Sequence, residues 1–375
     1  MKRKDRHMDY ADAPSEDMEI EAGRSKEERQ KKAIGVINKI LGFFMTTAIL
    51  IGVAGLSLEY VLVKGPSPSL KDTFVMTMLE TRRFGFIAHI FLSDEEVAEI
   101  KSRNTSTEVV EQDTSLINIP TQNTEGEEGE ESVTVETIDY GLVDEDGDGI
   151  IIDQVVKKLC NGYMMIVQDP SRVFVGKPNN FGGSGLSVED MCLKYDAIGG
   201  INGGGFYDDG GGGLGGDPTG LTVSEGVYYN EYSGTDCFIG FDEAGILHIG
   251  YMNAEDAHAS NIRDGVTFTY GPVLVANGMP VDATGIITGM NPRTAIGQRA
   301  DGAVLMLVID GRQAQSAGAT YADLTEIMLD YGAVNACNLD GGSSTAMWFD
   351  GEYVNNSATT PRALPTCFLV RKEGA

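Results

Sequence analysis

Three glycine-rich segments hold the side chains that are best suited to chemistry. They are residues 199–208 with Asn202, residues 291–297 with Arg293 and Thr294, and residues 338–345 with Asp340. Glycine has no Cβ, so a ligand can approach the main chain closely, and successive N–H groups can form a concave anion-binding nest. The three segments therefore predict a site for an anionic ligand.

Charged side chains in and near these segments offer two chemical roles. The planar guanidinium of Arg293 can hold two phosphate oxygens, although a structural ion pair would use the same group. Asp340 follows the apolar run 333–339, where partial burial would suit its carboxyl for general acid or base catalysis, whereas bonds from its own turn amides would keep it ionised. Asp310 follows the apolar run 304–309 and is either a general base or the start of a turn.

The remaining candidates are expected to bind substrate without reacting. The amide of Asn202 can hydrogen-bond a polar or anionic ligand, or it can hold its own glycine turn. Ser343 and Ser344 are predicted hydrogen-bond donors, because no histidine lies nearby in the sequence to activate them as nucleophiles. The predicted catalytic pair is Asp340 and Asp310, and the predicted substrate- and phosphate-binding set is Arg293, Thr294, Asn202, Gly341, Gly342, Ser343 and Ser344.

Acidic residues offer a weaker case for a metal. Asp144, Asp146 and Asp148 match the opening of an EF-hand loop, but the twelfth position is a valine where the loop needs a bidentate glutamate. An acidic turn is the favoured interpretation. Asp208 and Asp209 are ligands for a metal or substrate, or solvated turn acids, and no histidine pair has metal-binding spacing. The sequence thus predicts no cofactor and leaves a divalent metal open.

The charge of the chain is concentrated in one segment. The 375 residues contain 28 Lys and Arg and 56 Asp and Glu, for a net charge of −28. Fifteen of the acids lie in residues 104–156, which contain no Lys or Arg, so the acidity describes a self-repelling linker more than a binding surface. Because nucleic acid requires a basic face, no nucleic-acid partner is predicted.

An uncharged run near the N-terminus predicts a membrane helix. Residues 40–58 are 19 consecutive residues without a charge, close to the roughly 20 that a helix needs to cross the hydrocarbon core. A buried core helix or a cleaved signal peptide would show the same run. Lysines and an arginine cluster just before the run, so residues 1–39 are expected in the cytoplasm and the rest outside.

Composition divides the chain into five parts. We predict a cytoplasmic disordered tail (1–39), a transmembrane helix (40–63), a juxtamembrane helical stalk (64–103), an acidic linker (104–149) and a globular domain (150–375). In the stalk, Ser93 is a predicted helix N-cap.

The globular domain has the pattern of short strands separated by turns. Its apolar runs end at Gly, Asp, Asn or Pro, and the pairs Asp301-Gly302 and Asp350-Gly351 predict tight hairpins. Residues 320–331 predict an amphipathic helix that Thr320 caps and Gly332 ends. The expected fold is therefore α+β, a mixed and largely antiparallel sheet domain with a few helices, preceded by the single transmembrane helix. Five cysteines between 160 and 367 allow one or two disulfides.

Residues 160–371 resemble the phosphodiester glycosidases. The resemblance rests on the Asn202-Gly-Gly loop, on residues 292–297 (PRTAIG), on residues 308–312 (VIDGR) and on residues 338–344 (NLDGGSS), together with their order and spacing. The family's loop often has one more glycine after the aspartate. The resemblance implies hydrolysis of a sugar 1-phosphodiester, with a glycan or a glycosyl phosphodiester as the substrate.

Together these features predict a membrane-anchored, extracytoplasmic phosphodiester glycosidase that acts on a cell-surface glycan or glycosyl phosphate. Its partners would be that substrate and the membrane, through the N-terminal helix. The alternative is a non-catalytic glycan-binding module or a component of exopolysaccharide assembly.

Overall fold

The computed structural model describes residues 16–80, 85–103, 110–119, 141–207, 213–231, 234–268, 271–281, 289–357 and 360–374. The predictions on Asp208, Asp209 and most of the acidic linker fall outside these residues. The chain forms two compact units, Met1–Gly65 and Pro66–Ala375.

The first unit contains one long helix, α1 (Glu16–Lys64). Its part from Lys31 to Lys64 has a mean hydropathy of 2.0, and among the described residues it is the one helix long and apolar enough to cross a membrane. Large apolar side chains along it, such as Phe43 and Ile51, are exposed. Length and composition therefore make α1 a candidate membrane span, as predicted for residues 40–63.

Short helices open the second unit. They are α2 (Pro68–Glu80), the 3-10 helix η1 (Gly85–His89) and α3 (Asp94–Arg103). Ser93 caps α3 as predicted: its hydroxyl accepts from the Glu96 N–H at 3.2 Å, and the Glu96 carboxylate accepts from the Ser93 N–H at 2.8 Å. This reciprocal pair satisfies two of the backbone donors that a helix start leaves free.

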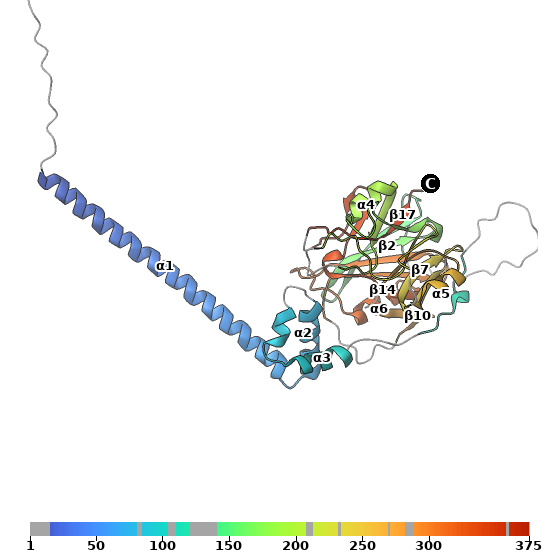
Figure 1. Cartoon of the computed structure of the whole chain (residues 1–375), viewed down its shortest axis with the longest axis horizontal. Helices are drawn as coiled ribbons and strands as arrows, with labels where there is room; N and C mark the ends of the chain where they lie inside the picture. Colours follow the sequence, from blue (N-terminus) through green and yellow to red (C-terminus); the bar gives the residue numbers. More distant parts are fainter. Residues whose placement is uncertain are drawn as a thin grey trace, which may run out of the picture. The chain divides into compact units, whose positions relative to one another are not determined.

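Three antiparallel sheets build the rest of the unit (Figure 1). The first sheet has the order β1 (Ile150–Lys157), β2 (Cys160–Val167), β13 (Val304–Ile309), β12 (Arg293–Arg299), β14 (Ala333–Asn338), β10 (Val273–Ala276) and β11 (Met279–Pro280). The second has the order β16 (Glu352–Tyr353), β15 (Met347–Phe349), β4 (Ala197–Asn202), β17 (Cys367–Arg371) and β3 (Val173–Gly176). The third has the order β6 (Val227–Tyr229), β5 (Thr222–Ser224), β9 (Ile262–Thr267), β7 (Asp236–Asp242) and β8 (Leu247–Met252).

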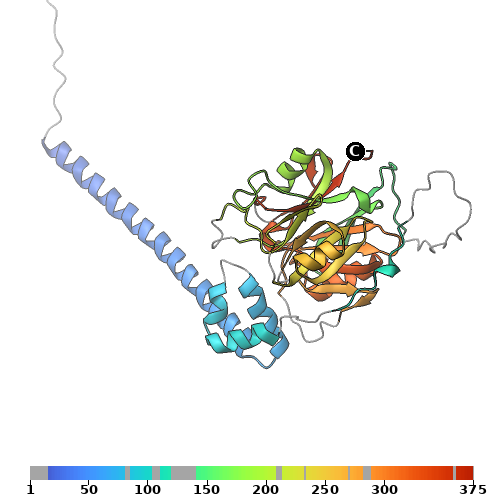
Figure 2. The ribbon, with the colours of Figure 1, turned by 45° about the vertical axis from the view of Figure 1, so that its right-hand side comes forward.

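The sheets pack face to face around one main core, and helices cover their outer faces (Figure 2). β13 shows why its sequence is apolar without a break: Val304, Met306 and Val308 face the main core, whereas Leu305 and Leu307 face the helix α6 (Tyr321–Asp330). Burying one such side chain contributes about 1.5–3 kcal/mol. Both faces of this strand therefore stabilise the domain and hold its end in a fixed place.

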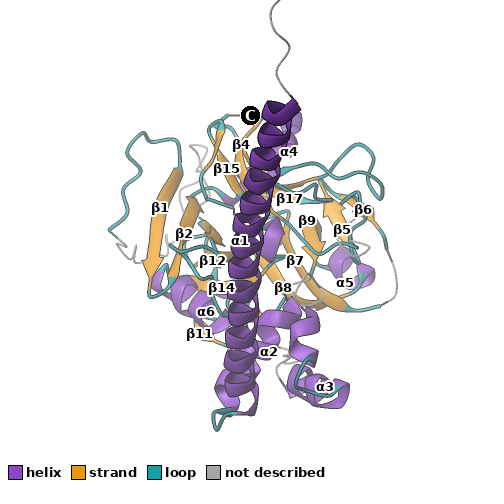
Figure 3. Cartoon of the chain, turned by 90° about the vertical axis from the view of Figure 1, so that its left-hand side faces the viewer, coloured by secondary structure: helices purple, strands orange, loops and turns teal. Residues whose placement is uncertain are grey.

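Two further helices complete the layers. α4 (Val188–Tyr195) packs on the second sheet, and α5 (Ala254–Ala259) packs on the third. α6 covers β10 and β14 of the first sheet. Figure 3 labels β1, β2, β12 and β14 of that sheet, in which β13 lies between β2 and β12. The predicted α+β, largely antiparallel fold is confirmed.

The five cysteines are buried free thiols. Cys237 on β7 and Cys337 on β14 come closest among those with a described contact, with 4.0 Å between their Sγ atoms. They lie in the main core between two sheets. The disulfides that the sequence allows are therefore not formed in this structure.

Candidate active site

Four strand ends meet at one end of the domain and bring the predicted residues into one neighbourhood. Arg293, which begins β12, pairs with Ile309, the last residue of β13, and Ala295 pairs with Asn338, the last residue of β14. Asn202 ends β4, and its side-chain oxygen accepts from the Thr294 hydroxyl at 2.7 Å. Antiparallel register thus places these strand ends, and the loops that follow them, at the same edge.

Asp310, one of the two predicted catalytic residues, is buried and held by hydrogen bonds. It is 6 % exposed and directly follows the buried β13. One carboxylate oxygen accepts from the Asn355 side-chain amide at 2.9 Å, and the other accepts from the Asn356 N–H at 3.1 Å. Burial raises the pKa of the Asp310 carboxyl, and the two hydrogen bonds oppose that shift. The side chain is thus held in place by neutral donors.

A small pocket opens beside Asp310. Its lining residues are Pro292, Asp310, Gly311, Arg312, Gly342, Ser343, Thr345 and Ser357. Thr345 is 2 % exposed, and its hydroxyl has no hydrogen-bond partner among the described residues. A buried hydroxyl without a partner costs about 1–3 kcal/mol.

Arg312 brings a positive charge to the same pocket. Its guanidinium donates to the Asn291 side-chain oxygen at 2.9 Å. A Cβ built on Gly342 would lie 3.6 Å from the Arg312 Nη2 atom, so the glycine backbone and the guanidinium are nearly in contact. Gly342 also has a φ of +63°, in the left-handed region that favours glycine. A side chain at this position would strain the turn and fill the space beside Arg312.

The segment 339–346 forms one wall of the pocket and is fixed from two sides. The Asn202 amide donates to the Asp340 carbonyl at 2.7 Å and accepts from the Ala346 N–H at 3.2 Å. The Gly342 N–H donates to the Pro292 carbonyl at 2.8 Å. Asn202 is fully buried, so in this structure its amide ties β4 and β12 to the loop. Asp340 as a whole is half-buried.

Arg293 lies on the other face of β12, toward α6. Its guanidinium donates to the Ala319 carbonyl at 3.2 Å and to the Gly289 carbonyl at 2.8 Å, and it lies 4.4 Å from the centre of the Tyr321 ring. It is 6 % exposed. The alternation of side chains along a strand places Thr294 toward Asn202 and Arg293 on the opposite face. The role of Arg293 as a phosphate ligand stays a prediction.

Arg362 approaches the same loop from the segment before β17. Its guanidinium donates to the Ser343 hydroxyl at 3.2 Å and lies 4.9 Å from the centre of the Phe206 ring. Burial lowers the pKa of Arg362, and the negative charge of Asp340 opposes that shift. Ser344 lies next in the loop, buried, and its hydroxyl has no partner among the described residues.

Sequence reasoning missed Arg312, Arg362 and Asn355 as site residues. Arg312 had a usable signal, since it stands two residues after Asp310 at the end of an apolar strand. Arg362 and Asn355 reach the site across 19 and 45 residues of chain, to Ser343 and Asp310. A contact between residues so far apart in the chain does not produce a recognisable pattern in the sequence around either residue.

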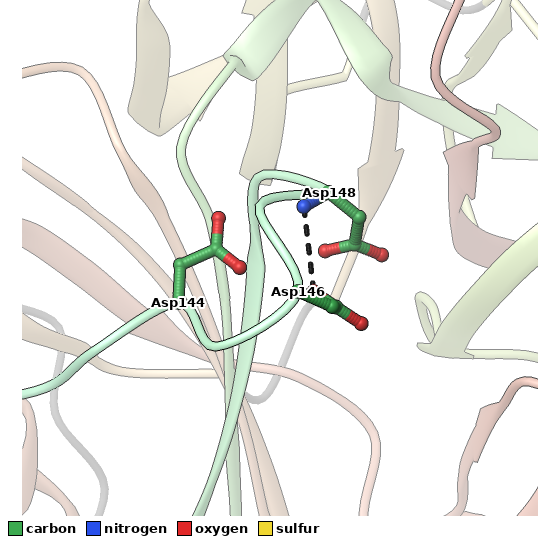
Figure 4. Close-up of side chains that lie close together, drawn as sticks. All are labelled: Asp144, Asp146 and Asp148. Carbon is green, nitrogen blue, oxygen red and sulfur yellow. Dashed lines mark hydrogen bonds between the residues drawn. The ribbon is translucent and has the colours of Figure 1, made fainter.

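The acidic turn before β1 is separate from this pocket. The carboxylate oxygens of Asp144, Asp146 and Asp148 lie within 4.8 Å of one another (Figure 4), the one such group of possible metal ligands in the part of the chain that the structure describes. Each carboxylate accepts from a backbone N–H of the turn; for example, Asp144 accepts from Gly147 and Gly149. These bonds are those of the acidic turn that the sequence favoured.

Comparison with known proteins points to one family. Residues 195–371 match the family model described as phosphodiester glycosidase. The chain is 30% identical over 199 residues to the SPbeta prophage-derived uncharacterized protein YomE of Bacillus subtilis, covering 50% of this chain and 29% of that protein. It is 27% identical over 213 residues to the mouse N-acetylglucosamine-1-phosphodiester alpha-N-acetylglucosaminidase, covering 51% of this chain and 40% of that protein. The chain thus spans less than half the length of these relatives.

A solved structure shares the fold. The zebrafish N-acetylglucosamine-1-phosphodiester alpha-N-acetylglucosaminidase catalytic domain, described as auto-inhibited by its pro-peptide, aligns with a TM-score of 0.51 at 21% identity, covering 60% of this chain and 82% of that one. The family match supports a hydrolase of this kind. The resemblance predicted from the motifs is confirmed, and residues 195–371 carry the pattern of the phosphodiester glycosidase family.

Proposed function

We propose that the protein hydrolyses a sugar 1-phosphodiester in the pocket between Asp310 and the 339–346 segment. The observation that carries this proposal is the lining of the pocket: a buried carboxylate, a guanidinium and an unpartnered hydroxyl belong to Asp310, Arg312 and Thr345. A phosphodiester offers a negative charge to the guanidinium, and a sugar offers hydroxyls to the other two groups. The family match supports the same reaction.

Arg312 and Arg362 are the proposed phosphate ligands. They approach Gly342 and Ser343, which are neighbours in one loop, so both guanidinium groups lie at the loop that we propose binds the anion. Arginine suits this task because its planar fork can bond two phosphate oxygens at once. In this structure the Arg293 guanidinium bonds the carbonyls of Gly289 and Ala319 on the α6 side of β12, and its role as a phosphate ligand stays a prediction.

Asp310 and Asp340 are the proposed acid–base pair. In the hydrolysis, the bond between the sugar C1 and its oxygen breaks, water supplies the new C1 hydroxyl, and the acceptor leaves as its phosphate monoester. One carboxylate takes the proton of the attacking water, and the other group donates a proton to the leaving oxygen. Burial of Asp310 raises its pKa, which suits a group that must exchange a proton.

The membrane location is part of the proposal. α1 is apolar and long enough to span a bilayer, and lysines precede its uncharged part. An extracytoplasmic domain tethered in this way would act on a glycan or glycosyl phosphate at the cell surface. The substrate would then be carried on, or close to, the membrane that holds the enzyme.

The direct test uses the full-length chain in detergent with a panel of sugar 1-phosphodiesters, among them one of N-acetylglucosamine. Reactions run in ¹⁸O-labelled water, and mass spectrometry locates the label. We expect the label on the sugar and an unlabelled phosphate monoester. Label on the phosphate would show that the phosphorus–oxygen bond breaks, and saturable binding with no product would favour a glycan-binding module.

A further inference from the structure

We infer that Asn355 is a positioning residue for the reaction: its side-chain amide fixes the orientation of the Asp310 carboxylate toward the pocket. This inference rests on the proposed function, because it assigns a role within the same site. Asn355 does not line the pocket, and no sequence motif pointed to it.

The orientation of the Asn355 amide follows from its two partners. The Met347 N–H, at the start of β15, donates to the Asn355 side-chain oxygen at 2.7 Å. A backbone N–H can only donate, so this contact requires the oxygen, and the NH₂ group must point the other way. That NH₂ group donates to the Asp310 carboxylate at 2.9 Å. Asn355 is 6 % exposed, so water does not compete freely for either bond.

The neighbouring residue completes the clamp with its main chain. The Asn356 N–H donates to the second carboxylate oxygen of Asp310 at 3.1 Å, whereas the Asn356 side chain is exposed and bonds Gln313. Each oxygen of Asp310 thus has one fixed donor from the 355–356 segment. These two bonds fix the plane of the Asp310 carboxylate. The lone pairs of its oxygens that do not take part in them can then accept from a ligand in the pocket.

The backbone of Asp310 is fixed from the opposite direction. Its N–H donates to the Asn161 carbonyl at 2.9 Å, and its carbonyl accepts from the Ser316 hydroxyl at 2.5 Å. Of the charged side chains, Arg312 lines the same pocket as Asp310. With the main chain held, the side-chain orientation depends on the bonds from residues 355 and 356.

The difference between side-chain and main-chain donors gives a matched pair of variants. Asn355→Ala removes a donor to Asp310, whereas Asn356→Ala keeps the N–H that Asp310 uses. Asn355→Asp keeps the acceptor for the Met347 N–H but replaces the donor to Asp310 by a second carboxylate, so the two acids repel each other unless they share a proton. A protonated aspartic acid can donate again, which makes its defect pH-dependent.

The first measurement is steady-state kinetics of the full-length variants on a sugar 1-phosphodiester. For Asn355→Ala we expect kcat to fall by about tenfold or more with KM changed by less than about threefold, because substrate binding does not use Asn355. Asn356→Ala should stay within about twofold of the parent, and Asn355→Asp should regain part of its kcat as the pH falls. An equal loss in both alanine variants would overturn the inference.

The second measurement does not depend on turnover. The ¹³C carboxyl signal of Asp310, assigned with Asp310→Asn, is titrated in the parent chain and in the Asn355 and Asn356 variants. Loss of a donor to the carboxylate should raise the pKa of Asp310 in Asn355→Ala and leave it unchanged in Asn356→Ala. That result with no hydrolysis of any substrate would reject the proposed function and retain the clamp, whereas an unchanged titration would reject the clamp.

Discussion

Arg312 is exposed and lies beside two residues of the pocket region, Asn291 and Gly342. Its substitution is therefore the most direct test of phosphate binding. It bonds Asn291 and lies beside Gly342. We expect Arg312→Ala to lower kcat/KM by at least about tenfold, because one charge-assisted hydrogen bond contributes about 1.5–3 kcal/mol. Arg312→Lys should recover only part, since an ammonium lacks the planar fork. The measurement is kcat/KM on a sugar 1-phosphodiester.

A matched control for this variant lies far from the pocket. Lys372, which directly follows the last residue of β17, makes an exposed ion pair with Asp196. Lys372→Ala changes the net charge by the same amount and should leave kcat/KM unchanged. Equal activity of Arg312→Ala and the parent would assign the anion to another group, and Arg293 would then be examined by the same substitution.

Asp310→Asn separates the catalytic role of the carboxylate from its structural one. The carboxylate accepts from two donors, Asn355 and Asn356, and an amide has only one oxygen to offer them. One donor is left without a partner, so we expect a loss of stability of about 1–3 kcal/mol. We expect a larger effect on kcat, about 10²–10⁴-fold, if Asp310 transfers a proton. Thermal unfolding and kinetics of the same variant compare the two losses, and a kcat loss no larger than the stability change would remove the catalytic role.

Local sequence patterns predicted some residues of the candidate site and not others. Asp310 and Asp340 stand out because each ends an apolar strand, and the glycines around Asp340 mark its loop. The partners of these residues depend on strand register, which brings Asn202 to a carbonyl 138 residues away. Register is a property of the whole sheet, and no single segment encodes it. For the same reason the face of β12 that Arg293 occupies was not foreseen.

At the scale of elements, α6 supports the site from behind. Tyr321 in its first turn packs against the Arg293 guanidinium, and the preceding Ala319 carbonyl accepts from it. The start of α6 is therefore tied to the start of β12, the strand that also carries Thr294. A substitution in the cap of this helix should lower the stability of the domain directly and should affect the pocket only through the position of β12.

Thr320→Ala tests that cap. The Thr320 hydroxyl accepts from the Asp323 N–H at 3.2 Å and donates to the Asp323 carboxylate at 2.6 Å. We expect the free energy of unfolding to fall by about 0.5–2 kcal/mol near neutral pH. Chemical denaturation of the variant and the parent measures this difference. A change below about 0.3 kcal/mol would show that the cap carries no weight.

The same cap gives a pH dependence with a definite sign. Burial alone would raise the pKa of Asp323, but its bonds with Thr320 and Lys158 lower it overall. A carboxyl with a lowered folded-state pKa stabilises the fold above its unfolded pKa, near 3.9, and loses that contribution as the pH falls through the folded value. The stability difference between Thr320→Ala and the parent should therefore shrink below about pH 4.

Elements were more predictable than their arrangement. The Ser93 and Thr320 caps and the end of α6 at Gly332 follow from neighbours in sequence, and the structure has all three. The turn at Asp350-Gly351 has φ values of +44° and +94°, as a tight hairpin requires. The sequence did not predict how the strands divide into three sheets, because an apolar run carries no information about which strand it pairs with.

At the scale of the whole molecule, the acidic charge and the apolar helix occupy different parts of the chain. Residues 104–156 hold fifteen acids, and α1 carries the apolar surface. Since Pro66–Ala375 forms a compact unit of its own, removal of residues 1–65 should leave the pocket intact. We expect the full chain to sediment with membranes and to need detergent for release, and the 66–375 fragment to remain in the soluble fraction with its activity. A full chain that stays soluble without detergent would contradict the membrane anchor.

The orientation of the anchor can be tested with cysteine chemistry because of how the native thiols lie. All five are buried, so a membrane-impermeant maleimide should label the folded parent poorly. Lys32→Cys and Ser102→Cys each add one thiol at an exposed position, before and after the apolar part of α1. The lysines before the apolar run should hold that end in the cytoplasm. In intact cells we therefore expect the reagent to label Ser102→Cys and not Lys32→Cys, and in opened cells we expect it to label both variants. If intact cells instead show labelling of Lys32→Cys alone, the pocket, and with it the substrate, lies on the cytoplasmic side.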